Sequence, residues 1–198
     1  MNPNDAALTT VAPQRARPLA EVPTLAAQAV EVLRSSQALF ALSADEARAV
    51  VGYMRVLSYP KGATLLREGD GSDSAEMLLL LDGEVSVDAG VDAPAGAVPI
   101  AALGPGSVLG EVALLDGRPR SAQCTALSPV RAGGLSRRAL ETMLDTHPRA
   151  AAKLMIALSR HISERLRAMG QQLQVYGQLT ASLQGELDRL RAAGGARR

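Results

Sequence analysis

The feature that most constrains the fold is a long central region of short apolar runs separated by turn-forming residues. Between Arg55 and Leu135 each run is only a few residues long, and Gly, Pro, Asp and Ser stand between the runs. Short runs with frequent turn signals are typical of β-strands, and a succession of them predicts a sandwich or barrel. The expected strands cover 56–59, 64–66, 77–81, 84–87, 98–102, 107–109, 122–127 and 132–135.

The region before these strands has helical spacing. Residues 1–23 are rich in Ala and Pro without a period, and we expect a disordered leader there. Thr24–Leu39 carries an apolar stripe, with Thr24 as the expected N-cap. A second helix is expected after Ser43, because Glu46 three residues later completes a capping box.

A heptad pattern dominates the C-terminal part. Ser136 is the expected cap of a helix that ends near Asp145, and Pro148 suits the first turn of the next helix. From Ser159 onward, apolar residues step alternately by four and three, which is typical of a coiled coil. This seam consists of Ile162, Leu166, Met169, Leu173, Tyr176, Thr180, Leu183, Leu187 and Leu190.

Three glycines interrupt the same helix. Gly170, Gly177 and Gly185 each cost about 1 kcal/mol in an isolated helix. The helix therefore needs a partner, and a parallel dimeric coiled coil is favoured over a frayed tail.

Composition narrows the function classes. The net charge is +1, so no whole-protein field favours nucleic acid or a membrane surface. Cys124 is the only cysteine, and one thiolate cannot ligate an iron–sulfur cluster. His147 and His161 do not form part of a ligand cluster, so we expect no metal and no cofactor. No apolar run approaches the ~20 residues of a membrane span, and no signal peptide is visible, so we expect a cytoplasmic protein.

One short segment contains the residue types that are best suited to binding a ligand. Gly110-Glu111-Val112-Ala113-Leu114-Leu115 is followed after a loop by Arg120-Ser121-Ala122. A carboxylate accepts a hydrogen bond from a hydroxyl, and the free N–H groups of a helix N-terminus attract an anion. A guanidinium neutralises phosphate through charge-assisted hydrogen bonds. The segment therefore suits a ligand with a sugar hydroxyl on one side and a phosphate on the other.

These residues resemble the phosphate-binding cassette of the cyclic nucleotide-binding domain, as found in bacterial catabolite-activator-type regulators, kinase regulatory subunits and nucleotide-gated channels. The resemblance extends to the corners around the cassette and covers roughly residues 40–168. It is carried by Pro60–Asp70, Met77–Val85, Ala126–Val130, Leu135–Ser136 and His147–Pro148. It implies a mainly β fold with flanking helices, namely a jelly roll with N-terminal helices and a long C-terminal dimerisation helix.

The resemblance also implies a role for each cassette residue. Glu111 matches the glutamate that accepts a hydrogen bond from the ribose 2′-hydroxyl, and Arg120 matches the arginine that pairs with the cyclic phosphate. Gly110 lets the backbone come close to the ligand, and Val112, Ala113 and Leu114 match the turn whose N–H groups meet that phosphate. Ser121 matches a residue that adds a hydroxyl contact.

The chain departs from the family pattern in three places. Leu109 stands where an aromatic residue often precedes the Gly-Glu pair. Arg165 and Leu166 stand where the catabolite activator carries a Thr-Ser pair that reads adenine, and we expect Arg165 to face the purine instead. After Leu190 only eight residues remain, too few for a recognition helix, so we expect no direct DNA binding.

The resemblance implies a non-enzymatic sensor of cyclic AMP or cyclic GMP. It is expected to form a homodimer through the C-terminal helix, whose ligand-dependent movement signals to an unknown effector protein. The alternative is a ligand-independent dimeric interaction module with a vestigial pocket. The expected segments are the leader 1–23, N-terminal helices 24–54, the jelly roll 55–147, the C-terminal helix 148–192 and a tail 193–198.

Overall fold

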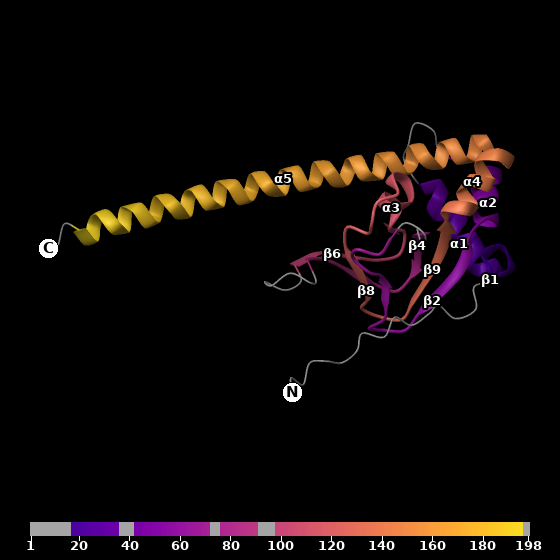
Figure 1. Cartoon of the computed structure of the whole chain (residues 1–198), viewed down its shortest axis with the longest axis horizontal. Coiled ribbons are helices and arrows are strands. Elements are labelled where there is room, and N and C mark those ends of the chain that lie inside the picture. The colour runs from indigo at the N-terminus through magenta and orange to yellow at the C-terminus, as the bar shows by residue number, and fades with distance from the viewer. Residues whose placement is uncertain (1–16, 36–41, 72–75, 91–97, 196–198) are drawn as a thin grey trace. The chain divides into compact units, whose positions relative to one another are not determined.

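The computed structural model describes residues 17–35, 42–71, 76–90 and 98–195. It divides into two compact units, Met1–Ala157 and Leu158–Arg198. The first unit contains every strand and the helices α1 to α4, and the helix α5 begins in it (Figure 1). The second unit is the remainder of α5.

The strands form two antiparallel sheets, which confirms the predicted jelly roll (Figure 1). The first sheet has the order β1-β2-β9-β4-β7, and the second has the order β3-β8-β5-β6. The strands are β1 (Arg17–Pro18), β2 (Arg55–Tyr59), β3 (Thr64–Leu66), β4 (Glu76–Asp82), β5 (Val85–Ala89), β6 (Val98–Leu103), β7 (Val108–Leu109), β8 (Gln123–Ala126) and β9 (Val130–Ser136).

The core lies between the two sheets. Leu57, Leu78 and Leu80 from the first sheet pack with Val85 and Cys124 from the second. Along β2 the buried residues alternate, because successive side chains of a strand point to opposite faces, whereas on β4 the whole run Met77–Leu81 is buried. The short apolar runs in the sequence therefore become one shared apolar interior.

The N-terminal helices are α1 (Pro23–Ser35) and α2 (Ala44–Gly52). The capping box of α2 is confirmed, since Glu46 N donates to Ser43 Oγ at 3.2 Å and Ser43 N donates to Glu46 Oε2 at 2.7 Å. The predicted cap of the first helix is wrong. Thr24 lies inside α1, which already starts at Pro23, because proline is well suited to a first turn. Residues 36–41, the expected end of this helix, lie outside the described residues.

The expected leader is shorter than its predicted bound. Residues 1–16 lie outside the described residues, but Arg17–Pro18 form β1 on the edge of β2, and Leu19–Glu21 form the 3-10 helix η1. Leu19 is fully buried, and its N–H donates to Met54 O at 2.9 Å. Tertiary packing of one leucine thus orders a segment that has no period of its own.

Two helices follow the sheets. The helix α4 (Arg137–Thr146) is capped as predicted, since Ser136 Oγ accepts from Ala139 N at 3.2 Å. The helix α5 (Pro148–Gly195) begins at the predicted proline and runs three residues beyond the predicted bound of 192. Its first turns are tied to α2, because Lys153 Nζ donates to Glu46 Oε2 at 2.6 Å.

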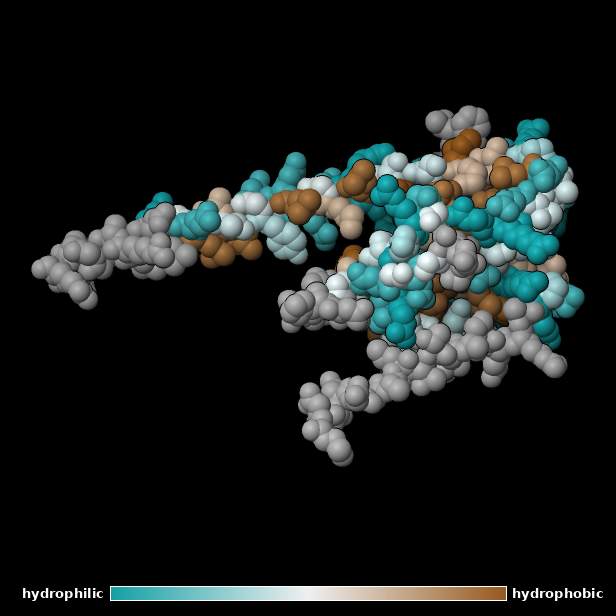
Figure 2. Space-filling view, in the orientation of Figure 1, coloured by the Kyte–Doolittle hydropathy of each residue, from teal (hydrophilic) through white to brown (hydrophobic). Residues whose placement is uncertain are grey.

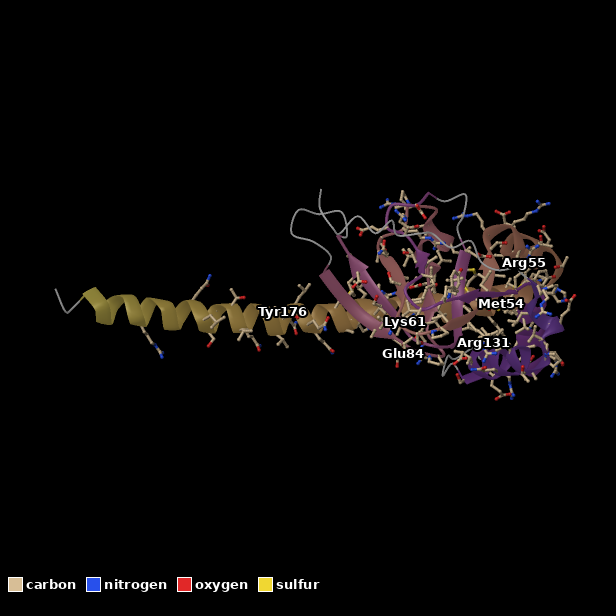
Figure 3. All side chains as sticks on the ribbon, turned by 90° about the horizontal axis from the view of Figure 1, so that it is seen from below. Met54, Arg55, Lys61, Glu84, Arg131 and Tyr176 are labelled. Carbon is tan, nitrogen blue, oxygen red and sulfur yellow. The ribbon has the colours of Figure 1, made fainter. Side chains whose placement is uncertain are left out.

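The second unit exposes an apolar face along one helix (Figure 2). Leu173 is 71% exposed, and the side chain of Tyr176 stands out from the ribbon (Figure 3). The large apolar seam residues that are exposed are Leu166, Met169, Leu173, Tyr176 and Leu183. The side chains of Leu187 and Leu190 lie outside the description. None of the described helices combines the length and apolarity that crossing a bilayer requires.

Candidate functional site

The cassette helix α3 (Glu111–Asp116) starts from a left-handed glycine. Gly110 has φ 72°, and Gly117 at the other end has φ 71°. A Cβ at position 110 would lie 2.9 Å from Glu76 O and still closer to the guanidinium of Arg120. Both the backbone angle and the space therefore require glycine at the point where the helix begins.

The start of α3 presents main-chain donors. The first hydrogen bond within the helix runs from Leu114 N to Gly110 O at 3.3 Å. The N–H groups of Glu111, Val112 and Ala113 precede this bond and have no acceptor inside α3. Val112 is exposed, whereas Ala113 and Leu114 are buried and anchor the turn against the sheets. Main-chain N–H groups at the start of a helix are donors that can bind an anion.

Arg120 is a buried cation beside this turn. It is 6% exposed, and its Nη1 donates to Gly110 O at 2.8 Å while Nη2 donates to Glu76 O at 2.7 Å. Its main chain is also fixed, since Arg120 N donates to Asp70 O at 3.0 Å and Gly69 N donates to Arg120 O at 2.9 Å. Arg120 thus links the cassette, the start of β4 and the turn after β3.

Burial and the neighbouring groups act on the pKa of Arg120 in opposite directions. Burial lowers the pKa of the guanidinium, and the neighbouring Cys124, Glu76, Asp70 and Glu111 act in the opposite direction. A guanidinium nevertheless stays protonated in proteins. The site therefore keeps a fixed positive charge next to a helix N-terminus.

Glu111 is the buried acid of the site. It is 1% exposed and occupies the first turn of α3, where a negative charge is favoured by the helix dipole. A carboxylate and a guanidinium thus lie in one cassette, and the carboxylate acts against the lowering of the Arg120 pKa that burial causes.

Comparisons with known proteins agree on the identity of this arrangement. The family model described as a cyclic nucleotide-binding domain matches residues 56–147. A crystal structure of a cyclic nucleotide-binding domain from Methylobacillus flagellatus is 32% identical with a TM-score of 0.67, and the match covers 73% of this chain and 80% of that one. This chain belongs to the cyclic nucleotide-binding domain family.

Two curated relatives of this domain are regulators. A CRP-like cAMP-activated global transcriptional regulator of Mycobacterium tuberculosis is 27% identical over 115 residues, which are 58% of this chain and 50% of that protein. A cAMP-dependent protein kinase regulatory subunit of Aspergillus niger is 32% identical over 106 residues, which are 54% of this chain and 24% of that protein. The chain therefore spans half or less of the length of each of these relatives.

The structure brings most of the predicted site residues of this family together. Gly110, Glu111, Val112 and Ala113 form the turn at the start of α3, and the guanidinium of Arg120 bonds to the first of them. Ser121 follows on the exposed side of the chain just before β8. Arg165 lies on α5 in the second unit, and its role at the base stays a prediction.

Two neighbours of the cassette were not predicted. Tyr59 at the end of β2 is buried in the core cluster, and burial, with a smaller contribution from Glu76, raises its pKa to about 12. Arg120 opposes this rise, so the phenol lies within electrostatic reach of the site. A tyrosine at the end of a strand is ordinary, and nothing in the sequence distinguishes it.

Arg137 is the second unpredicted neighbour. Its Nη2 donates to Ala113 O in α3 at 3.0 Å, and its guanidinium lies under Gly117. Its Nε is buried and has no hydrogen-bond partner in the described part of the chain. This side chain connects the start of α4 to the C-terminal end of the cassette helix. Among the described residues, no group of three or more His, Cys, Asp or Glu side chains could hold a metal ion.

Proposed function

We propose that this chain is a non-enzymatic cytoplasmic sensor of a cyclic mononucleotide, cyclic AMP or cyclic GMP. The observation that carries the proposal is Arg120. It is a buried cation held by two main-chain carbonyls, beside the N–H groups that start α3. A guanidinium fixed at this place can donate charge-assisted hydrogen bonds to a phosphate.

Each part of the ligand has a proposed partner. The cyclic phosphate meets Arg120, Ser121 and the N–H groups of Val112 and Ala113. The ribose 2′-hydroxyl donates to the Glu111 carboxylate, whose position in the first turn of α3 suits this role. Arg165 contacts the purine. The named functions of the two regulators support the same ligand class.

The proposed output runs through α5. The exposed apolar face of its second unit supports pairing with a second copy of the chain. Ligand binding is proposed to shift the population of α5 positions, and this change reports occupancy to a protein partner.

The alternative is an interaction module whose nucleotide pocket is vestigial. The presence of both Glu111 and Arg120 in one folded cassette favours binding over this alternative. Calorimetry of the full-length chain with cyclic AMP, cyclic GMP and cyclic di-GMP separates the two. Saturable binding of a cyclic mononucleotide supports the sensor, whereas absence of binding by all three supports the vestigial module.

A further inference from the structure

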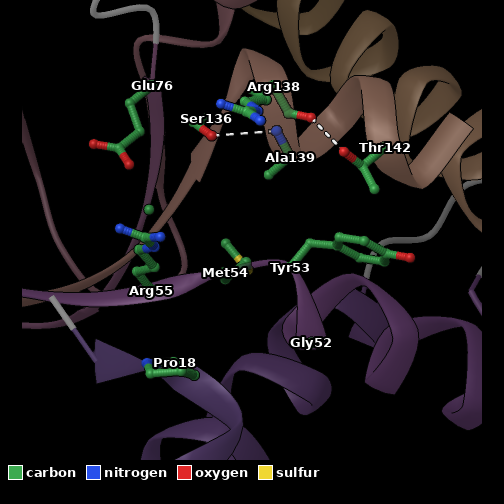
Figure 4. A pocket seen from close by; sticks show the side chains of 11 residues that line it. Pro18, Gly52, Tyr53, Met54, Arg55, Glu76, Ser136, Arg138, Ala139 and Thr142 are labelled. Carbon is green, nitrogen blue, oxygen red and sulfur yellow. Dashed lines mark hydrogen bonds between the residues drawn. The ribbon is translucent and has the colours of Figure 1, made fainter.

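A cavity lies at the end of the first sheet, and its lining residue Glu76 adjoins the cassette through the hydrogen bond from Arg120 to its main-chain carbonyl. Its volume is about 470 Å³, and it is bounded by β2, β4, β9 and the first turns of α4 (Figure 4). All of its lining residues belong to the first unit. Gly110, Glu111, Arg120 and Ser121 are not among them. The cavity is within the size range of small-molecule sites.

The cavity contains charges of both signs. Glu76, Arg55 and Arg138 line it (Figure 4). Burial raises the pKa of the Glu76 carboxyl, and Arg55 and Arg120 act against that rise. Neither Arg55 nor Arg138 makes a side-chain hydrogen bond or ion pair with another residue that the structure describes. A perturbed carboxyl with cations in a cleft is a recognised mark of a binding site.

The register of the sheet places Glu76 and Arg55 on the same face. Glu76 is two residues from buried Leu78 on β4, and Arg55 is two residues from buried Leu57 on β2. Side chains two apart on a strand share a face, so Glu76 and Arg55 continue the core-facing rows of their strands. Glu76 is half-buried at this position, where a carboxyl needs a polar or charged partner, and Arg55 is exposed at the end of β2.

A glycine provides the space that these charges occupy. Gly134 pairs with Arg55 on one side and Leu78 on the other. A Cβ at position 134 would lie 3.1 Å from the Glu76 carboxyl carbon and 2.6 Å from Leu57 Cδ1. Because Gly134 has no side chain, the carboxyl of Glu76 can occupy this part of the cavity.

We propose that this cavity is a second ligand site, and that it binds a small zwitterion of the α-amino acid class. The guanidiniums of Arg55 and Arg138 receive the carboxylate, and the carboxylate of Glu76 receives the ammonium group. The apolar wall at Met54 and Ala139 receives the side chain of the ligand. The proposal does not depend on the cassette being a nucleotide site.

The charges select a zwitterion over a simple ion. A bare oxyanion would be attracted by the two guanidiniums but repelled by Glu76. A bare ammonium ion would be attracted by Glu76 but repelled by the two guanidiniums. Charge-assisted hydrogen bonds of both signs are satisfied together only by a ligand that carries both groups.

The first test uses the full-length chain and each common L-amino acid, presented singly and followed by calorimetry and ligand-observed NMR. At least one amino acid is expected to bind. Its N-acetyl derivative and its α-amide, each lacking one charge, are expected to bind about tenfold more weakly or worse. Absence of binding by every amino acid at millimolar concentration would overturn the site, and equal binding of either derivative would overturn the zwitterion.

The second test localises the binding. Glu76→Gln and Arg138→Ala are each expected to weaken the amino acid about tenfold. Arg48→Ala, which removes an exposed arginine of α2 outside the cavity, is the matched control and should leave affinity unchanged. Arg138 is exposed, so its variant remains informative even if Glu76→Gln fails to fold. Full affinity in Arg138→Ala would place the ligand elsewhere and refute the proposal.

Discussion

At the scale of single residues, substitution of Arg120 is expected to cause the largest loss of cyclic nucleotide affinity. Arg120→Ala is expected to reduce cyclic nucleotide affinity at least about tenfold, because charged hydrogen bonds contribute ~1.5–3 kcal/mol each. Calorimetry measures this directly. Arg118→Ala is the matched control, since Arg118 is an exposed arginine of the same loop. Equal affinity of the Arg120 variant and the wild-type chain would remove the cassette assignment.

Substitution of Glu111 is expected to affect recognition of the sugar and not recognition of the phosphate. Glu111→Ala should cost less affinity than Arg120→Ala, but it should abolish discrimination between a cyclic nucleotide and its 2′-deoxy form. The reason is that the 2′-hydroxyl loses its acceptor while the phosphate contacts remain. Competition between the two ligands measures the discrimination. A variant that still prefers the ribonucleotide would show that another group reads the hydroxyl.

At the scale of elements, Arg137 holds α3 against α4. Arg137→Met loses the bond to Ala113 O but also removes a buried Nε without a partner. We therefore expect the free energy of unfolding to change by less than about 1 kcal/mol. Nucleotide affinity should fall about fivefold, because α3 must then be ordered on binding.

Urea unfolding and calorimetry on the same Arg137→Met protein separate the two quantities. Arg131→Met, which breaks an exposed pair with Asp82, is the control and should alter neither. A loss of stability with unchanged affinity would contradict the link between α3 and α4.

The contact between α2 and α5 is expected to be acid-sensitive. The hydrogen bond from Lys153, then that from the Ser43 N–H, lowers the pKa of Glu46 from 4.5 to about 2. The folded-state pKa is depressed, so the contribution of Glu46 is complete above about pH 4.5 and is lost as the pH falls toward about 2.

Glu46→Gln should make the free energy of unfolding less dependent on pH across this window. Urea unfolding at neutral pH and near pH 3 measures the dependence, with Glu31→Gln in an exposed pair as control. An identical pH dependence in Glu46→Gln and wild type would show that Glu46 carries no such coupling.

At the scale of the whole molecule, the exposed seam of α5 predicts a parallel dimer. Pairing would bury leucines that contribute ~1.5–3 kcal/mol each, enough in sum to outweigh the glycines. Leu173→Glu should weaken the dimer strongly. Val175→Glu is the matched control, because Val175 is similarly exposed but lies off the seam.

Light scattering over a concentration series decides the assembly. A full-length chain that stays monomeric at micromolar concentration would show that the seam does not pair. Equal dimerisation of both glutamate variants would show that contact between chains lies elsewhere.

The sequence by itself determined features whose causes are local. The capping box of Ser43 and Glu46, the cap at Ser136 and the start of α5 at Pro148 each depend on residues a few positions apart. The strands were predictable because their turns carry glycine and proline. The cassette was predictable because its glycine, acid and arginine lie within a dozen residues and resemble a known motif.

Only the tertiary structure decided which distant groups meet. The bond from Arg120 to Glu76 O joins residues 44 apart, and that from Arg137 to Ala113 O joins residues 24 apart. The ordering of Leu19 and the cavity beside Gly134 likewise depend on packing between strands and helices. Periodicity and caps act through neighbours along the chain, whereas these contacts exist only once two sheets have closed and brought separate strands together.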